Sequence, residues 1–359
     1  MVRILLSHTH VVNGRLSCLL MALLLASLFA TGCTPFVPPT AGGPTPGVTQ
    51  TQPPSASEVL FGGNADLLPL QGELGRHLAI VRTYHNLEAS LPSPVSSFPS
   101  SIEQQVLAQG STLLTSVHSM NWQSVTAGNQ DSALSTFLQK VNQAALNAHL
   151  TAIYVCFGHE ANSPGQVQDG TPQDFIAAWQ HVYQLAARLH LNWQQGGRLH
   201  WVWIMTHGAF LPQGNGASFW PGTTYVDVVG VDNYVTGACR TLPPGQTYVA
   251  PASAAVMPTQ FQDPVQAWAQ QHAPGLPIFQ AEWGVVPFMD ASIRPAFIRA
   301  VTSYLHTHPQ IRAMLYWNAF GEDGHGGGNE CDYRLDKDAA SVAALAAMGH
   351  DPHFQAQAT

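Results

Sequence analysis

Two glutamates, each at the end of a short apolar segment, are the residues of this chain best suited to chemistry. Glu160 ends the segment 151–160, and Glu282 ends the segment 276–282. A carboxylate at the end of a buried strand must be desolvated and paired, so it is costly unless a site uses it. Two such groups across a barrel mouth can cleave a glycosidic bond with retention: one protonates the leaving oxygen and the other attacks the sugar carbon. Two unrelated carboxylates that cap loops are the alternative.

The segments around both glutamates belong to an alternation of strand-like and helix-like sequence. Eight short stretches are apolar on both faces, as buried parallel strands are: 58–62, 78–84, 112–118, 151–158, 199–206, 226–234, 277–283 and 311–318. Helical patterns lie between them at 131–150, 171–191, 264–272, 293–308 and 338–348. This order predicts an α/β fold, a (β/α)8 TIM barrel. A doubly wound open sheet is the alternative, but the sequence after the first strand lacks the GxGxxG phosphate turn.

In a TIM barrel, active-site residues lie at the C-terminal ends of the strands and face the interior. Counting by twos gives the predicted inward sets: Ile80, Arg82 and Tyr84; Leu114, Ser116 and His118; Tyr154, Cys156, Gly158 and Glu160; Val228, Gly230, Asp232 and Tyr234; Ile278, Gln280 and Glu282; Ala313, Leu315 and Trp317. In each set the polar or large aromatic member falls at the C-terminal end, which is consistent with the barrel.

The N-terminal part of the chain has the pattern of an export signal. Arg3 and Arg15 precede the apolar run 16–30, which is short for a membrane span. The run closes on Ala-Thr-Gly-Cys33, which resembles the lipobox of bacterial lipoproteins. That resemblance implies cleavage before Cys33 and lipidation of its thiol, so that a lipid anchor is the only membrane attachment. Plain secretory cleavage and an uncleaved anchor are alternatives, and all three place the rest of the chain outside the cytoplasm.

Composition then divides the chain. We expect a signal peptide at 1–32, a Pro/Thr/Gly-rich linker at 33–56 that cannot bury a core, and one barrel domain at 57–359. Net charge is −8 with 13 Lys and Arg and no basic run, which argues against a nucleic-acid partner. We expect a monomer.

The five cysteines are compatible with an exported protein. Cys239 and Cys331 lie in loop-like sequence after the sixth and eighth strands, on one rim of the barrel, and an oxidising compartment permits a disulfide between them. Cys156 lies inside an apolar strand and is expected to be a buried small hydrophobe. No CxxC pair indicates zinc, and the oxygen-rich segment 322–332 fits no calcium loop. We predict neither a metal nor a cofactor.

Several motifs, in order along the chain, resemble glycoside hydrolase family 26. His159-Glu160-Ala161-Asn162 is similar to the family's His-Glu-Met-Asn acid/base motif, and Ala281-Glu282-Trp283-Gly284 to its nucleophile motif. The stretch 220–234 is similar to the family's Tyr-Pro-Gly, Val-Asp and Asp-x-Tyr sequence, and Trp122 with 128–131 to its Trp and Gly-x-x-Asp pattern. The resemblance covers nearly all of the predicted domain and implies a barrel glycosidase.

The resemblance also implies roles for individual residues. Glu160 would be the acid/base and Glu282 the nucleophile, with Tyr234 and Arg82 as donors to Glu282. Trp317 would stack on a sugar ring, because axial C–H groups give pyranoses an apolar face. His159 and Asn162, from the acid/base motif, belong to the predicted substrate-binding set. His118 is also part of this set, because His118 and His207 sit at strand ends and could bind hydroxyl groups. Packing alone is the alternative role for His159, Tyr234 and Trp317.

Two departures from the family pattern bear on the substrate. The segment 163–170 carries no aromatic residue where mannanases of the family have a run of tryptophans, and Cys156 stands where the family often has Arg. The resemblance implies hydrolysis of a β-linked polysaccharide, β-1,4-mannan first and β-1,4 or mixed-linkage glucan next. A non-catalytic carbohydrate-binding lipoprotein on the same barrel is the rival interpretation. A purely structural envelope protein would leave the paired glutamates unexplained.

Overall fold

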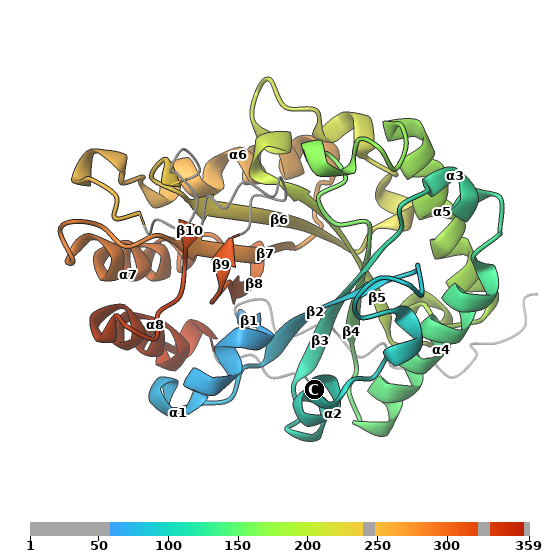
Figure 1. The fold of residues 1–359 in the computed structure, drawn as a ribbon, viewed down its shortest axis with the longest axis horizontal. Helices are drawn as coiled ribbons and strands as arrows, with labels where there is room; N and C mark the ends of the chain where they lie inside the picture. Colours follow the sequence, from blue (N-terminus) through green and yellow to red (C-terminus); the bar gives the residue numbers. More distant parts are fainter. Residues whose placement is uncertain (1–57, 240–247, 322–330, 355–359) are drawn as a thin grey trace, which may run out of the picture. The chain divides into compact units, whose positions relative to one another are not determined.

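Eight parallel strands close into a barrel in the computed structural model of the chain (Figure 1). The model describes residues 58–239, 248–321 and 331–354, all within the unit Thr51–Thr359. The strands follow one another around the barrel in chain order: β1 (Leu60–Asn64), β2 (Ile80–Asn86), β3 (Thr112–His118), β4 (Ile153–Phe157), β5 (Leu199–Thr206), β6 (Val228–Val235), β7 (Ile278–Val285) and β8 (Ile311–Tyr316). The predicted TIM barrel is confirmed. The predicted signal peptide, the linker and Cys33 lie outside the described residues.

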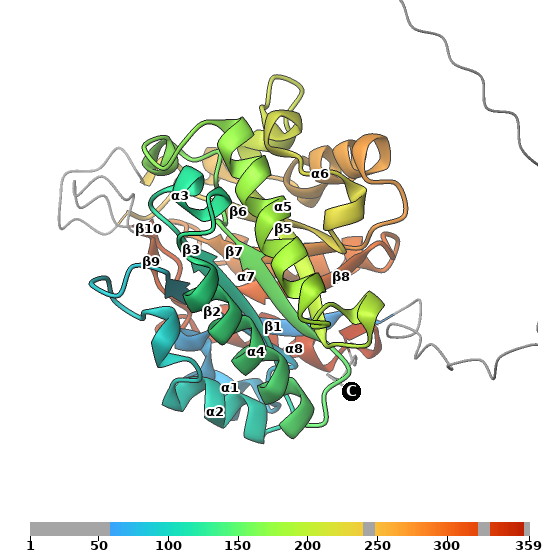
Figure 2. The same cartoon turned by 90° about the vertical axis from the view of Figure 1, so that its right-hand side faces the viewer.

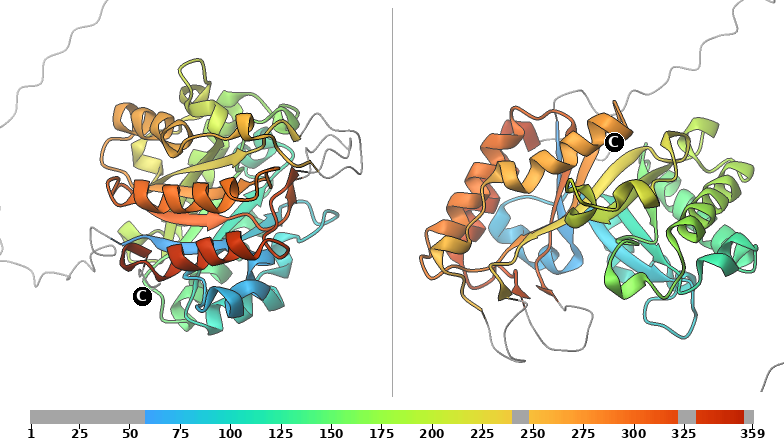
Figure 3. Two further views of the ribbon diagram at one scale, coloured as in Figure 1. Left: turned by 90° about the vertical axis from the view of Figure 1, so that its left-hand side faces the viewer. Right: turned by 90° about the horizontal axis from the view of Figure 1, so that it is seen from above.

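Helices cover the outside of the barrel (Figure 2). They are α1 (Gln71–Leu74), α2 (Ser101–Ala108), α3 (Trp122–Thr126), α4 (Asp131–Asn147), α5 (Pro172–Arg188), α6 (Pro258–His272), α7 (Ile293–Leu305) and α8 (Ala339–His350). The last two run side by side (Figure 3). Local chemistry sets several starts: a capping box of Ser100 with Glu103 opens α2, and one of Thr171 with Asp174 opens α5.

Two details of the helices differ from the sequence prediction. The helix α6 begins at Pro258 and not at Pro264, because proline fits the first helical position and the second proline is tolerated inside the helix. The short helices α1, α2 and α3 are not among the predicted ranges, although the capping box of α2 is visible in the sequence. Neither difference moves a strand, so the predicted strand ends remain close to the observed ones.

One strand breaks the predicted alternation. Ile278 and Gln280 were predicted to face the interior with Glu282, but the Gln280 side chain accepts a hydrogen bond from α6 outside the barrel. Phe279 instead packs inside the barrel against Tyr154, with ring centroids 4.8 Å apart. The pairing register of β7 shifts between Gln280 and Glu282. An extra residue of this kind reverses the facing of the side chains that follow it, so Glu282 points inward although Gln280 does not.

A short hairpin and a disulfide cross the C-terminal rim of the barrel. The strands β9 (Phe320–Gly321) and β10 (Cys331–Asp332) pair antiparallel after β8. Cys239 and Cys331 form the predicted disulfide, with Cα atoms 5.3 Å apart. It ties the segment after β6 to the hairpin after β8. Within the described residues, no helix has the length and apolar character needed to cross a membrane.

Candidate active site

Glu282 lies near the C-terminal end of β7 and has a donor for each carboxylate oxygen. The Tyr84 hydroxyl donates a hydrogen bond to Oε1, and the Tyr234 hydroxyl donates one to Oε2. Arg82 Nη1 lies 3.0 Å from Oε1. Hydroxyl and guanidinium donors stabilise the ionised form of a carboxyl group. Glu282 is 8% exposed, so these donors, and not bulk water, define its environment.

A buried ion pair between Arg82 and Asp232 fixes the position of Arg82 beside Glu282. Arg82 is 1% exposed, and its Nη1 also contacts Asp232 Oδ1 at 2.6 Å. Burial raises the pKa of Asp232 well above its usual range; Arg82 opposes this, while the charges of Glu282 and Glu160 reinforce it. For Arg82, burial lowers the pKa, but Asp232 and Glu282 outweigh it and raise the pKa. One guanidinium is therefore shared between two carboxyl groups.

The pKa values of Tyr84 and Tyr234 keep both hydroxyl groups in the form that donates a hydrogen bond. Burial is the main cause that raises the pKa of Tyr84 and of Tyr234, and the negative charge of Glu282 adds to it in both. Both hydroxyls therefore keep their protons at neutral pH. The Tyr84 ring also lies 5.1 Å from the Arg82 guanidinium carbon, within cation–π distance.

Glu160 follows β4 in an uncommon backbone conformation. Gly158 leaves the strand at φ +60°, and Glu160 itself has φ +52°, which a residue with a side chain rarely adopts. Two backbone hydrogen bonds hold it there: its N–H donates to Ile204 O at 2.9 Å, and its carbonyl accepts from Ser163 at 2.7 Å. Such conformations persist where the surrounding structure fixes them, and they concentrate at functional sites.

Glu160 and Glu282 share a neighbour in Asp232. The charge of each raises the pKa of Asp232, so both carboxyl groups lie within electrostatic reach of it. The strands β4 and β7 are not adjacent in the barrel, so the two glutamates approach Asp232 from different sides. The predicted roles of acid/base and nucleophile remain predictions.

His159 and Asn162, on either side of Glu160, have different environments. The His159 ring packs edge-on against Tyr84, with centroids 5.4 Å apart. Burial lowers the pKa of His159 well below its usual range, and the charge of Arg82 lowers it further, so the ring is neutral near pH 7. The Asn162 side chain donates to Thr206 Oγ1 at 2.6 Å and accepts from its N–H at 3.0 Å. It thus anchors this loop to β5, and its role toward a substrate stays a prediction.

Trp317 and His118 lie at the ends of β8 and β3. Trp317 is half-buried and packs edge-on against Tyr84 at 5.9 Å. His118 Nε2 lies 3.0 Å from Asp169 Oδ2, and its Nδ1 lies 3.3 Å from Asn86 Oδ1. Both ring nitrogens of His118 therefore have partners that fix its orientation. The aromatic surface of Trp317 is placed beside the residues that hold Glu282.

Sequence reasoning missed Tyr84, Asp232 and Asp169 as candidate site residues. Tyr84 and Asp232 were in the predicted inward sets, each two positions from a residue that was selected, so facing alone could have identified them. Nothing in the sequence indicated Asp169, which reaches His118 from the loop after β4. Cys156 is buried as predicted, and burial raises its pKa to about 12, which makes it a poor nucleophile. His207, also partly buried, has its pKa lowered by desolvation.

No group of three or more His, Cys, Asp or Glu residues suited to a metal occurs in the described part of the chain. The candidate site is thus an assembly of carboxyl, phenol, guanidinium and aromatic groups at the C-terminal mouth of a barrel. This combination provides one carboxylate fixed by donors and a second carboxyl group on another strand. Such a set can transfer a proton and form a covalent bond to an electrophilic carbon.

Comparison with solved structures identifies barrels of the same fold. No protein-family model and no curated protein matches the chain. An endo-β-1,4-mannanase from Cellulomonas fimi is 14% identical, with 83% of this chain and 72% of that one covered and a TM-score of 0.54. The catalytic domain of a family 26 endo-β-1,4-mannanase from Bacillus sp. JAMB-750 is 16% identical, covering 84% and 88%, with a TM-score of 0.52.

A third similar structure is the family 26 domain of an endo-β-mannanase/endo-β-glucanase from Prevotella bryantii. It is 12% identical, covers 83% of this chain and 90% of that one, and has a TM-score of 0.51. Identities this low establish the fold and leave activity to be argued from the site. The chain therefore has the barrel fold of family 26 glycoside hydrolases.

Proposed function

We propose that this protein is a retaining glycoside hydrolase that cleaves a β-linked polysaccharide, with β-1,4-mannan as the first candidate. The observation that carries the proposal is the environment of Glu282, which two tyrosine hydroxyls and Arg82 hold at the end of β7. A carboxylate fixed in this way is suited to attack. Glu160, at the end of β4, supplies the second carboxyl group that retaining hydrolysis requires.

In the first step, Glu282 attacks the anomeric carbon while Glu160 donates its proton to the glycosidic oxygen. The bond from carbon to the leaving oxygen breaks, and a glycosyl ester of Glu282 forms. In the second step, the Glu160 carboxylate takes a proton from water, and the water oxygen displaces Glu282 from the sugar. The two inversions together retain the anomeric configuration.

The donors around Glu282 act mainly in the second step. As the ester breaks, negative charge returns to the Glu282 oxygens, and Tyr84 and Tyr234 donate to those oxygens. The retaining mechanism requires a separation of about 5–5.5 Å between the Glu160 and Glu282 carboxyl groups, whereas more than about 6.5 Å would suit inversion. Product stereochemistry, read by NMR during hydrolysis, separates the two: the β-anomer must appear first.

β-Mannan is the first candidate substrate, and β-glucan is the second. The Cellulomonas and Bacillus structures are mannanases, and the Prevotella protein is described as a mannanase and glucanase. The segment 163–170 after Glu160 has no aromatic side chain, which weakens the parallel with mannanases. We therefore place β-1,4 and mixed-linkage glucans second. We propose in addition that the chain is exported and anchored through a lipid on Cys33.

The second candidate function is carbohydrate binding without turnover, favoured by the missing aromatic run. The test uses Glu160→Ala and Glu282→Ala with an activated aryl β-glycoside, after the unmutated chain has been assayed on mannans, glucans and xylans. Each variant should lose polymer hydrolysis. A good leaving group needs no protonation, so Glu160→Ala should still form the ester, and azide should rescue it as the retained β-glycosyl azide. Glu282→Ala should instead give the inverted α-azide.

The outcome separates the two functions. If both variants bind polymer and the unmutated chain hydrolyses nothing on the panel, the catalytic proposal is wrong and the binding function replaces it. Gln104→Ala, an exposed change on α2, serves as the control for general effects of substitution.

A further inference from the structure

A buried glutamine lies two residues before Glu282 and contacts its backbone. Gln280 is 0% exposed, and its side chain lies on the outer side of β7, where α6 covers the strand. Nε2 of Gln280 donates to the Glu282 carbonyl at 2.7 Å and to the Val231 carbonyl, on β6, at 3.1 Å. This side chain therefore joins β6 to β7 at the backbone of the proposed nucleophile.

These contacts lie where the pairing of β7 is irregular. Against β6, Val231 pairs with Gln280, but Asp232 pairs with Glu282. The register therefore skips Ala281, and an irregularity of this kind interrupts the ladder of backbone hydrogen bonds. Buried carbonyl groups need a donor, and the Gln280 amide supplies one to a carbonyl of each strand. The irregularity that turns Glu282 toward the interior is thus bridged by a side chain.

The orientation of the Gln280 amide is determined by its neighbours. Its NH2 group lies against two carbonyl oxygens, which can only accept hydrogen bonds. Its Oε1 accepts a hydrogen bond from Nε2 of Gln262, on α6, at 2.6 Å. An amide turned the other way would place an oxygen against two oxygens and an NH2 group against an NH2 group. Only one orientation therefore satisfies all three contacts.

Gln262 is fixed in turn by the docking of α6 on the barrel. Gln262 is 0% exposed, as Gln280 is. The residue before it, Phe261, accepts a hydrogen bond through its backbone carbonyl from Nδ2 of Asn233 at 2.6 Å. The helix α6 is therefore bonded to β6 through Asn233 and to β7 through Gln280.

Burying two amides costs free energy that only their hydrogen bonds offset. Each amide gives up hydrogen bonds to water, whereas a methionine of similar length would fill the same space without that cost. The bonds of Gln262 and Gln280 lead to one place, the backbone at the irregularity of β7. The feature that these bonds can maintain is the direction of Glu282, whose carboxylate must meet its donors on the interior side.

We propose that Gln280 is a positioning residue for Glu282. Its bond to the Glu282 carbonyl fixes the direction from which the carboxylate reaches the hydroxyls of Tyr84 and Tyr234. Gln262 keeps the Gln280 amide turned so that its nitrogen faces that carbonyl. The expected effect on turnover rests on the proposed function, and the effect on the geometry of Glu282 does not.

The first test is Gln280→Met in the full-length chain, assayed on an activated aryl β-glycoside. Methionine keeps an unbranched chain of similar length and removes every hydrogen bond of the amide. The value of kcat/KM, which reports the attack by Glu282, should fall about 10- to 100-fold, because a displacement of about 1 Å of a reacting group has effects of this size. Gln262→Met leaves the donors of Gln280 in place and should cause a smaller loss. It also serves as the second variant if Gln280→Met does not fold.

A double variant separates positioning from general damage to the fold. In Glu282→Ala, azide takes the place of the carboxylate, so the direction of residue 282 no longer matters for the reaction. Adding Gln280→Met should therefore leave the rate of α-glycosyl azide formation by the Glu282→Ala chain unchanged. A purely structural role of Gln280 would lower that rate as well.

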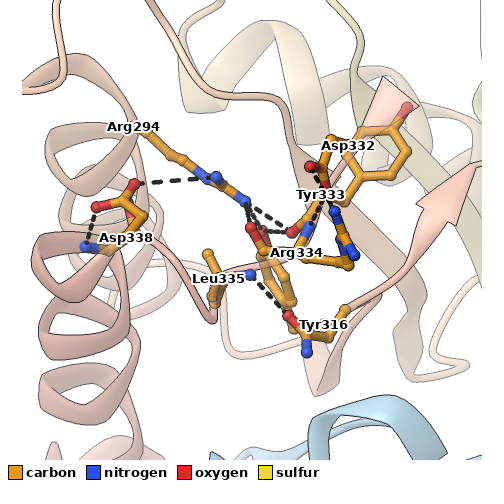
Figure 4. Close-up of polar contacts among 9 residues, drawn as sticks. Arg294, Tyr316, Asp332, Tyr333, Arg334, Leu335 and Asp338 are labelled. Carbon is orange, nitrogen blue, oxygen red and sulfur yellow. Dashed lines mark hydrogen bonds and ion pairs between the residues drawn. The ribbon is translucent and has the colours of Figure 1, made fainter. Parts of the chain in front are cut away.

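Tyr316→Phe is the matched control for the loss of a buried hydrogen bond beside β7. The Tyr316 hydroxyl, on β8, donates to the Tyr333 carbonyl at 2.8 Å. Arg294 Nη2 donates to the same carbonyl at 2.6 Å, so Tyr333 stays in place when the hydroxyl is removed (Figure 4). The strand β8 is the other neighbour of β7, and the change leaves the hydrogen bonds of Glu282 intact. Its kcat/KM should stay close to that of the parent chain.

The proposal is overturned if Gln280→Met has the same kcat/KM as Tyr316→Phe, or if it lowers azide formation in Glu282→Ala as much as it lowers turnover of the parent chain. A crystal structure of Gln280→Met gives a readout that needs no turnover: the Glu282 carboxylate should have moved away from the hydroxyl of Tyr84 or Tyr234. If the parent chain cleaves no glycoside, the proposed function fails, and this structure alone decides the positioning role. A carboxylate that keeps both hydroxyl contacts would then overturn it.

Discussion

The hydroxyls of Tyr84 and Tyr234 offer a direct test of how Glu282 works. Tyr84→Phe and Tyr234→Phe each remove one donor to a carboxylate oxygen and leave the ring in place. In the first chemical step Glu282 loses charge, so the donors are needed less in the transition state than before it. In the second step the charge returns, and the donors stabilise the departing carboxylate. We therefore expect the second step to slow more than the first.

The size of the loss in kcat follows from the energy of a hydrogen bond to a charged group. A hydrogen bond to a charged group contributes about 1.5–3 kcal/mol. If about half of the charge has returned in the transition state, each hydroxyl contributes roughly 0.8–1.5 kcal/mol, which corresponds to a loss of about 4- to 12-fold in kcat. The double variant should lose about 16- to 150-fold if the two hydroxyls act independently, since they contact different oxygens of Glu282.

The assay uses an aryl β-glycoside with a good leaving group, so that the second step limits turnover. Each variant should show a lower kcat, a smaller change in kcat/KM, and a burst of released phenol as the glycosyl ester accumulates. Tyr154→Phe is the matched control: this tyrosine is also buried in the barrel, but its ring packs on Phe279 away from Glu282. Kinetics in both variants that equal those of Tyr154→Phe, without a burst, would refute the role assigned to the hydroxyls.

Two further predictions concern stability. Replacing both Cys239 and Cys331 by Ser should lower the free energy of unfolding by about 2–4 kcal/mol, because the disulfide closes a loop across a sequence separation of 92. Urea unfolding measures this change. Adding reductant to the parent chain should lower its free energy of unfolding by the same amount, which serves as the consistency check. Burial lowers the pKa of His200 to about 4. The unfolded chain binds that proton near pH 6.5, so the free energy of unfolding falls as pH falls from about 6.5 to 4. His200→Gln should reduce this fall by about 1–3 kcal/mol, less than the full linkage value because the ring is partly exposed, and identical pH slopes for the two proteins would contradict it.

The barrel could be predicted because its strands are apolar on both faces and its helices alternate with them. The same logic placed Arg82, Tyr234 and Trp317 at the mouth with the two glutamates, since strand ends and inward facing are local properties. The disulfide was predictable because strand order alone places the segments after β6 and β8 on one rim. These features depend on period and order, which a single sequence contains.

Other features depend on contacts between distant segments, which the sequence does not contain. The predicted inward facing of Gln280 was wrong. The irregularity in β7 that changes the direction of its side chains depends on the pairing of β7 with β6 and β8. Asp169 reaches His118 across 51 positions of sequence, and only the fold brings them together. Asp232 was visible as an inward residue, but its pairing with Arg82 spans 150 positions. Contacts between distant segments, and not residue type, decide which of the inward-facing residues belong to the site.

The balance of charge at the barrel mouth favours catalysis over simple carbohydrate binding. Arg82 is shared by Asp232 and Glu282, and Glu160 adds a third carboxyl group within electrostatic reach of Asp232. If all three carboxyl groups were ionised, their charges and that of Arg82 would sum to −2 beside a buried ion pair, which is unfavourable. Burial accordingly raises the pKa of Asp232, and the other two carboxylates raise it further although Arg82 opposes them. A site that only binds neutral sugars gains nothing from bringing these carboxyl groups together, whereas retaining hydrolysis uses two carboxyl groups, one as the proton donor and one as the nucleophile.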